Sequence, residues 1–252
     1  MINSVRNTVL AILNKNNYGY ISPQDFNLFA KQAQLDIFED YFYQYNYQVN
    51  KENQRLSGTG YADIKKGYEE VIDLFTLNLP LTFTAGSFYL FPSVATTGAD
   101  YYFIDKVLFS PSQAAGAGVL ATDFVEVEKV SNSKINLLRN SLLTAPNDTY
   151  PAYIQDNSQM IVFGPTNLQQ NSIWCQYIRY PRDPQWTFTT LTGGEPVFNQ
   201  SNPSFQDFEL PLDDEPSLVM KILQFAGMSI REIQAVQFGQ ADEQYEDNRE
   251  KQ

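Results

Sequence analysis

Residues 21–48 read ISPQDFNLFAKQAQLDIFEDYFYQYNYQ, the stretch on which the fold class depends. Ser22 can cap free backbone amides, Pro23 suits a first helical position that needs no donor, and Asp25 favours the positive end of a helix. Apolar side chains then recur at spacings of three and four, at Phe26, Phe29, Ala30, Ala33 and Ile37. The pattern predicts a long helix with one apolar face.

Four alternating tyrosines at the end of this stretch allow two interpretations. Tyr41, Tyr43, Tyr45 and Tyr47 occupy every second position, which by itself is typical of a strand. No Gly or Pro follows them until Gly58, so we favour a continued helix. Tyrosines on all sides of a helix would suit one packed between neighbours, and we therefore expect these four to make contacts between subunits.

The rest of the chain predicts an α+β fold in which a helical module from both chain ends holds an inserted β module. An amphipathic set at residues 5–13 and a helix at 62–75 complete an N-terminal helical part, residues 1–76. Residues 77–204 contain short aromatic and β-branched runs between Gly, Pro, Ser and Asn clusters, which predict an antiparallel sheet or small sandwich. Within this module we expect a short helix at 131–139 and flexible loops at 116–122 and 191–204.

Residues 205–252 return to a helical pattern and are expected to pack on the N-terminal helices. Acidic residues and Pro216 open an apolar stripe that is expected to stop at Gly227, and a capping box at Ser229 restarts or bends the helix. The last residues, GQADEQYEDNREKQ, have almost nothing to bury. We expect an exposed acidic tail that is frayed or held by a partner.

Composition argues against most familiar enzymes. The chain contains no histidine, which excludes a Ser-His-Asp or Cys-His nucleophile and a His-bearing zinc site. Carboxylate-pair or lysine chemistry stays open because 29 Asp and Glu residues are present. A net charge of −12 argues against binding to the phosphate backbone of nucleic acids. A need for solubility alone would explain this charge.

The individual candidates for chemistry also have simpler interpretations. Glu126 and Glu128 share one face of a strand and predict a solvated edge, while Asp213, Asp214 and Glu215 precede a helix as capping charges. Gly-rich stretches near residues 58–61 and 115–118 lack the lysine of a phosphate loop. We assign no catalytic residue, cofactor or metal.

The cysteine content and the hydropathy of the chain indicate the environment in which the protein is expected to fold. The single Cys175 lies in an apolar segment and is expected to be a small buried side chain. No run of about 18 apolar residues and no secretory signal occurs, so we expect no membrane contact and cytosol-like surroundings.

The aromatic content, with 16 Tyr, 18 Phe and 2 Trp, has two functional interpretations. Trp174 or Trp186 could stack on sugars in a carbohydrate-binding or polysaccharide-degrading tail protein. Large subunit interfaces are the other place where such aromatics gather.

Three stretches together resemble a known family. They are the helix at 21–45, the segment YPAYIQDNSQMIVFGPTNLQQNSIWCQYIRYPRDPQW at 150–186, and FELPLDDEPSLVMKILQFAGMSIREIQAVQFGQADEQYEDNREKQ at 208–252. In order and texture they resemble the tail adaptors of short-tailed phages, also called tail tubular or head-to-tail connector ring proteins, including those of crAss-like phages.

The resemblance implies a non-enzymatic virion protein of the head-tail junction. It implies a ring of identical subunits, commonly a dodecamer of twelve copies, that joins the portal protein to adjacent tail or ring proteins and is assembled in the host cytoplasm. Double-stranded DNA would pass through its channel without specific binding during ejection, and an acidic lining would suit that passage. By the same resemblance the tail residues Phe238, Tyr245 and Arg249 are expected to dock on the portal.

Overall fold

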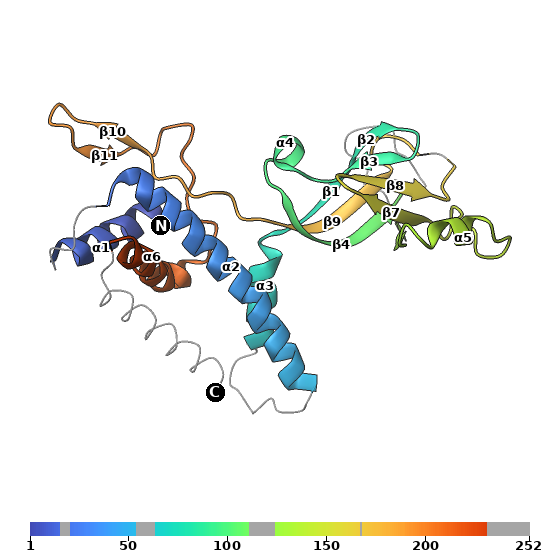
Figure 1. Ribbon diagram of the computed structural model, residues 1–252, viewed down its shortest axis with the longest axis horizontal. Helices are drawn as coiled ribbons and strands as arrows, with labels where there is room; N and C mark the ends of the chain where they lie inside the picture. The colour runs from blue at the N-terminus through green and yellow to red at the C-terminus, as the bar shows by residue number, and fades with distance from the viewer. Residues whose placement is uncertain (16–20, 54–63, 111–123, 167, 231–252) are drawn as a thin grey trace. The chain divides into compact units, whose positions relative to one another are not determined.

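The protein is a mixed helical and β structure, which confirms the α+β class (Figure 1). The computed structural model describes residues 1–15, 21–53, 64–110, 124–166 and 168–230. Within the described chain, helices lie toward both ends and sheets lie between them. The expected loop at 116–122 lies outside the described residues.

The chain divides into two compact units, each built around its own buried residues. The helical unit contains residues 1–71 and 181–252, and the β unit contains residues 72–180. The second boundary therefore lies at residue 180 and not at 204 as expected. Residues after 180 belong with the helices because Gln185 pairs with Gln206 and the Trp186 backbone exchanges hydrogen bonds with the Asn27 side chain.

The helical unit has three long helices at its centre. These are α1 (Ile2–Lys15), α2 (Pro23–Asn53) and α6 (Glu215–Ile230), and α6 packs against both of the others. The same unit contains most of α3 (Ile64–Asp73), the 3₁₀ turn η1 (Leu212–Asp214) and the hairpin of β10 (Phe188–Thr190) and β11 (Pro196–Phe198). Most apolar side chains of the stripes predicted from the sequence are buried, whereas Ile12 is 38% exposed and Phe29 is half-buried. The buried ones are Val5, Val9, Leu13, Phe26, Ala30, Ala33, Ile37, Val219, Ile222, Leu223 and Ala226.

Two local expectations in the helical unit were wrong. Helix α6 does not stop at Gly227 but continues to Ile230, because Ala226 and Gly227 are buried and packing outweighs the cost of a helical glycine, about 1 kcal/mol. Residues 191–204 are not one flexible loop, since they contain β11, which pairs with β10.

The β unit consists of two sheets that are connected at both edges by consecutive strands. One has the order β1 (Thr76–Pro80), β9 (Ile173–Arg179), β4 (Tyr101–Phe109), β5 (Val125–Glu126), and the other has the order β2 (Thr82–Ala85), β3 (Phe88–Leu90), β8 (Gln159–Phe163), β7 (Ala152–Asp156), β6 (Glu128–Lys129). Only Leu81 separates β1 from β2, and only Val127 separates β5 from β6. The two sheets are therefore joined through these bent strands into a closed barrel, which goes beyond the expected sheet or sandwich.

One pair in this barrel is parallel, whereas the sequence predicted antiparallel pairing. Strand β6 runs parallel to β7, with Glu128 opposite Ala152 and Lys129 opposite Tyr153. A parallel neighbour requires a long connection. That connection contains the short helix α5 (Ile135–Arg139), as the sequence predicted, whereas α4 (Val94–Thr97) was not anticipated.

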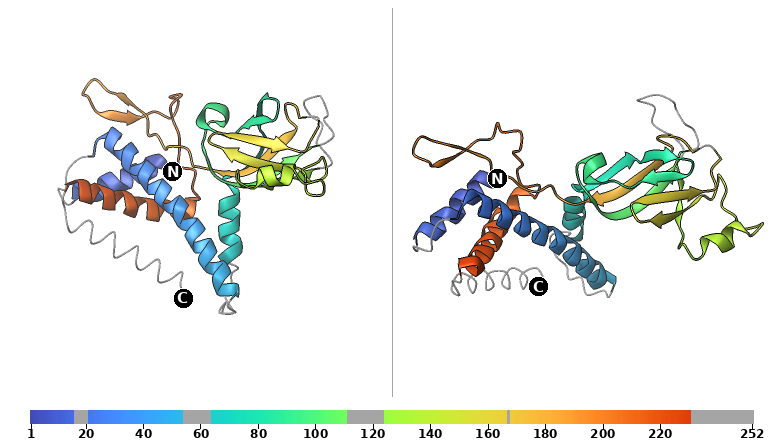
Figure 2. Two further views of the ribbon diagram at one scale, coloured as in Figure 1. Left: turned by 45° about the vertical axis from the view of Figure 1, so that its right-hand side comes forward. Right: turned by 45° about the horizontal axis from the view of Figure 1, so that its top comes forward.

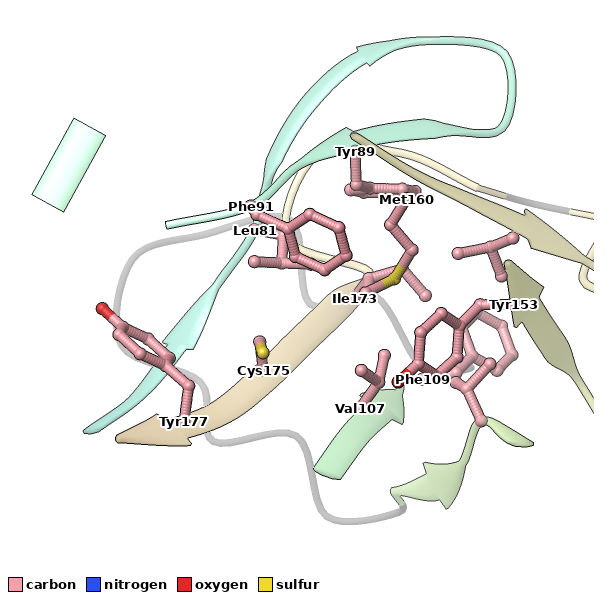
Figure 3. Packing of buried hydrophobic residues seen from close by; sticks show 12 residues of the cluster. Leu81, Tyr89, Phe91, Val107, Phe109, Tyr153, Met160, Ile173, Cys175 and Tyr177 are labelled. Atoms are coloured by element: carbon pink, nitrogen blue, oxygen red, sulfur yellow. The ribbon is translucent and has the colours of Figure 1, made fainter. Parts of the chain in front are cut away.

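The barrel interior is filled by inward-facing side chains of both sheets (Figure 3). Alternate residues of neighbouring strands meet there, such as Val107 with Cys175 and Phe109 with Ile173. The buried cluster is Leu81, Tyr89, Phe91, Val107, Phe109, Val127, Tyr153, Met160, Val162, Ile173, Cys175 and Tyr177.

Candidate interaction surfaces

The tyrosine row of α2 is divided between the interior and the surface. Tyr41 is only 8% exposed, and its hydroxyl donates a hydrogen bond to Asp214 of η1, so it cannot serve as the free intersubunit contact that we expected. Tyr43 is 59% exposed. Tyr45 and Tyr47 are half-buried, and Tyr45 donates to Glu69 at 3.1 Å. Residues two apart on a helix differ by about 200° in direction, which is why Tyr41 is buried while Tyr43 is exposed.

The Tyr41 hydroxyl fixes η1 against α2. Burial is the main cause that raises the pKa of Tyr41. The carboxylates of Asp214 and Asp40 raise it further because they disfavour a negative charge on the tyrosine oxygen. The phenol therefore keeps its proton and remains a donor to Asp214. Asp213 and Leu212, the other members of η1, are exposed, and Leu212 is 75% exposed.

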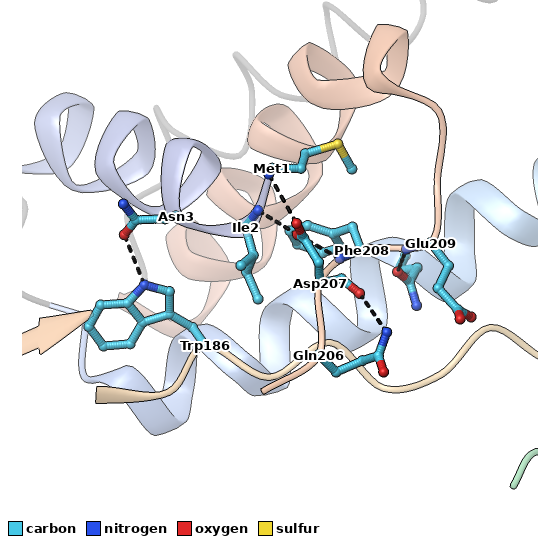
Figure 4. Close-up of polar contacts among 9 residues, drawn as sticks. Met1, Ile2, Asn3, Trp186, Gln206, Asp207, Phe208 and Glu209 are labelled. Atoms are coloured by element: carbon cyan, nitrogen blue, oxygen red, sulfur yellow. Dashed lines mark hydrogen bonds and ion pairs between the residues drawn. The ribbon is translucent and has the colours of Figure 1, made fainter. Parts of the chain in front are cut away.

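Trp186 is a structural residue of the helical unit and not a sugar-stacking surface. It is 2% exposed and lies parallel to Phe188 and Phe198, with ring centroids at 5.7 and 5.9 Å. The Arg6 guanidinium covers its ring at 3.7 Å, and its indole nitrogen donates to Asn3 at 3.1 Å (Figure 4). These contacts hold the β10–β11 hairpin on α1.

Trp174 keeps part of its surface accessible. It is half-buried on β9, its indole nitrogen donates to the Asn171 carbonyl at 3.1 Å, and it contacts Phe124 edge-on. With Trp186 buried in the other unit, the two tryptophans do not form a shared aromatic platform within either unit.

The carboxylates near β5 are solvated as predicted, and those at the start of α6 lie at a helix start, although Asp214 accepts a hydrogen bond from Tyr41 and does not cap the helix. Glu126 and Glu128 are exposed on either side of buried Val127. Asp213, Asp214 and Glu215 lie where α6 begins, at the positive end of the helix. Among the described residues, no three His, Cys, Asp or Glu side chains are grouped so that they could hold a metal ion.

Cys175 is buried in the barrel, as predicted. Burial raises the pKa of its thiol to about 12, and nearby Asp105 adds to the effect. The thiol is therefore protonated near neutral pH and has little nucleophilic character.

Exposed leucines of the β unit are a feature that sequence reasoning missed. Leu137, Leu142 and Leu143 lie on α5 and the turns after it, and Leu142 and Leu143 are fully exposed. We call residues 129–150 the α5 lobe. The signal was present in the sequence, since residues 129–147 contain Lys129, Lys134 and Arg139 but no Asp or Glu.

The proposed portal-docking residues, Phe238, Tyr245 and Arg249, lie outside the described residues. No described helix combines the length and the apolar character that crossing a membrane requires. No protein-family model matches the chain, and no curated protein matches it.

Proposed function

We propose that this chain is a non-enzymatic structural subunit that assembles with copies of itself into a ring at the portal, the head-tail junction of a short-tailed phage virion. The observation that carries the proposal is the set of large apolar side chains exposed on ordered segments of both units: Leu137, Leu142 and Leu143 in the β unit, and Leu28, Tyr43 and Leu212 in the helical unit. Solvent-exposed apolar side chains on ordered segments favour contact with another protein.

The residue inventory supports a structural role over catalysis. The chain has no histidine, and its one thiol is buried and protonated. Glu126 and Glu128 are exposed on the surface of the barrel and not enclosed. Assembly through complementary surfaces needs none of these groups.

The resemblance to tail adaptors suggests which kind of assembly the chain forms. Tail adaptors have a helical module from both chain ends with a β module inserted, and such rings commonly contain twelve copies. We propose that this ring joins the portal to the next tail component and surrounds the path of the DNA. The residues after Gly239, with Tyr245 and Arg249, are proposed to dock on the portal together with Phe238.

Charge fits a channel that does not hold DNA. The helical unit contains 12 Lys and Arg against 21 Asp and Glu, a net −9, and the β unit contains 5 against 8, a net −3. Negative potential repels phosphate backbones, so DNA would pass without binding. The helical unit is therefore the proposed lining.

Electron microscopy of the purified chain tests the proposal. At high protein concentration, and when mixed with portal particles, the chain is expected to form rings with a central hole. A chain truncated after Gly239 is the matched variant, and it should still form rings but fail to join portal particles. A chain that stays monomeric under both conditions, or that binds or cleaves polysaccharide, would contradict the proposed function.

A further inference from the structure

The α5 lobe combines exposed leucines with positive charge in a strongly acidic protein. Its first 19 residues, 129–147, have a net charge of +3, whereas the whole chain has −12. Lys134 and Leu137 are exposed, and Leu137 is 74% exposed. A surface that is both apolar and cationic is suited to an acidic protein surface that also offers apolar contact.

The lobe is anchored to the barrel by its other face. Ile135 is buried, and Leu138 packs beside it on Ala152, Ile154, Ile161 and Phe163 of β7 and β8. The Arg139 guanidinium lies 5.0 Å from the Phe163 ring centroid, which fixes the end of α5. Figure 2 shows α5 and the turns after it extending from the β7 side of the β unit.

The far end of the lobe is also fixed. The Asn147 side-chain carbonyl accepts hydrogen bonds from the amides of Thr149 and Tyr150, at 2.9 and 2.8 Å. Asp148 accepts from the amide of Thr166 at 2.9 Å. With both ends held, Leu142 and Leu143 are presented to the solvent on an ordered turn, and the chain pays an unfavourable hydration cost unless a partner covers them.

A matching surface exists on the helical unit. We call Leu212 and Asp213 of η1, with Glu215 at the start of α6, the η1 surface. The hydrogen bond from Tyr41 to Asp214 holds η1 against α2 and leaves Leu212 and Asp213 exposed. This surface therefore pairs an exposed leucine with carboxylates, the complement of a lobe that pairs leucines with Lys134 and Arg139.

We infer that the α5 lobe docks on the η1 surface of a second copy of this chain, an inference that rests on the proposed function. The two surfaces differ, so the contact is head-to-tail and each copy keeps one free surface of each kind for the next copy. A head-to-tail contact repeated with a closing rotation generates a ring. Charge complementarity favours this occupant over DNA, because a chain with net charge −12 is repelled by phosphate backbones.

A mixing experiment tests the contact. One variant alters the lobe through Lys134→Glu, Leu142→Ser and Leu143→Ser, and the other alters the η1 surface through Leu212→Ser and Asp213→Lys. All five side chains are exposed, so both variants should keep the circular dichroism and thermal unfolding of the parent chain. Sedimentation velocity should show that each variant alone needs at least about a tenfold higher concentration to assemble.

The two variants mixed in equal amounts should form a 1:1 dimer and nothing larger, since each supplies the one surface that the other lacks. Leu191→Ser is the control, because Leu191 is exposed between β10 and β11 but belongs to neither surface, and it should assemble as the parent does. A chain carrying both Lys134→Glu and Asp213→Lys should regain part of the assembly that either change alone removes.

The outcomes separate this inference from the proposed function. If the parent chain assembles and both variants assemble equally well, the inferred contact is wrong while the ring proposal stands. If the parent chain never assembles, the proposed function fails and the contact fails with it. A lobe variant that assembles normally but loses binding to duplex DNA or to anionic vesicles would overturn the contact and assign the lobe to that ligand.

Discussion

Gly164 illustrates how one residue determines the position of the lobe. Its φ is +112°, and a Cβ placed on it would lie 2.7 Å from the Asn147 carbonyl oxygen and 2.8 Å from the Asn147 nitrogen. The turn at Asn147 therefore lies directly on the backbone after β8, which only glycine permits. Because Asn147 lies near the end of the α5 lobe, this contact helps to set where the exposed leucines are held.

Gly164→Ala is expected to destabilise the β unit by about 2 to 4 kcal/mol, because it combines an unfavourable φ with a clash against backbone atoms that cannot rotate away. Urea unfolding measures the loss. Gly86→Ala is the matched control, since Gly86 has a φ of +61° but no heavy atom within 4 Å of the added Cβ. It should lose only about 1 to 2 kcal/mol, and equal losses in the two variants would show that the Asn147 contact does not constrain the site.

At the scale of elements, α2 shows how local signals and tertiary contacts combine. The Ser22 hydroxyl accepts the Asp25 amide at 3.1 Å and donates to the Asp25 carboxylate at 2.6 Å, as the sequence predicted for a helix start. The helix then continues through all four tyrosines, since no residue in that stretch breaks it. Its interior contacts also decide which tyrosine is buried, and Tyr41 is the one that faces η1.

Ser22→Ala should cost about 1 kcal/mol of stability in the helical unit, because the Asp25 amide loses its acceptor. Chemical denaturation followed by far-ultraviolet circular dichroism gives the change. Ser22→Asn restores a capping oxygen and should recover most of the loss. If Asn is as destabilising as Ala, the hydroxyl does not act as a cap.

At the scale of the whole molecule, each unit has its own core and its own tryptophan. Trp186 lies in the helical unit and Trp174 lies in the β unit. The barrel core and the packing of α6 on α1 and α2 use different residues. Separate cores predict separate unfolding transitions, and a single two-state description of the full chain would then fail.

Two single-tryptophan variants report these transitions. Trp174→Phe leaves only Trp186, and Trp186→Phe leaves only Trp174. Gly164→Ala should lower the urea midpoint that Trp174 fluorescence reports and leave the midpoint from Trp186 unchanged, whereas Ser22→Ala should do the reverse. Midpoints that shift together in both backgrounds would show that the units unfold as one.

Much of the fold could be predicted from local patterns, while the candidate site could not. The stripes of α1, α2 and α6 were predictable because their spacing reports one buried face, and buried Cys175 was predictable from its apolar neighbours. The division at residue 180 was missed because it depends on contacts of Trp186 with Asn3, Arg6 and Asn27, which lie on helices distant in the sequence. The exposed leucines of the lobe were missed because an apolar residue near a helix ordinarily predicts burial.

The sequence by itself determined the α+β class, the helices toward both ends of the chain, the lack of histidine and the net negative charge. These features depend on residue types and local spacing. Only the tertiary structure decided that bent strands close the barrel, that the Tyr41 hydroxyl donates a hydrogen bond to Asp214 and that Leu142 and Leu143 stay exposed. The physical reason is that side-chain burial and strand pairing depend on which segments come into contact. The pairing of distant segments such as β1 and β9 cannot be inferred from the local sequence pattern of either strand.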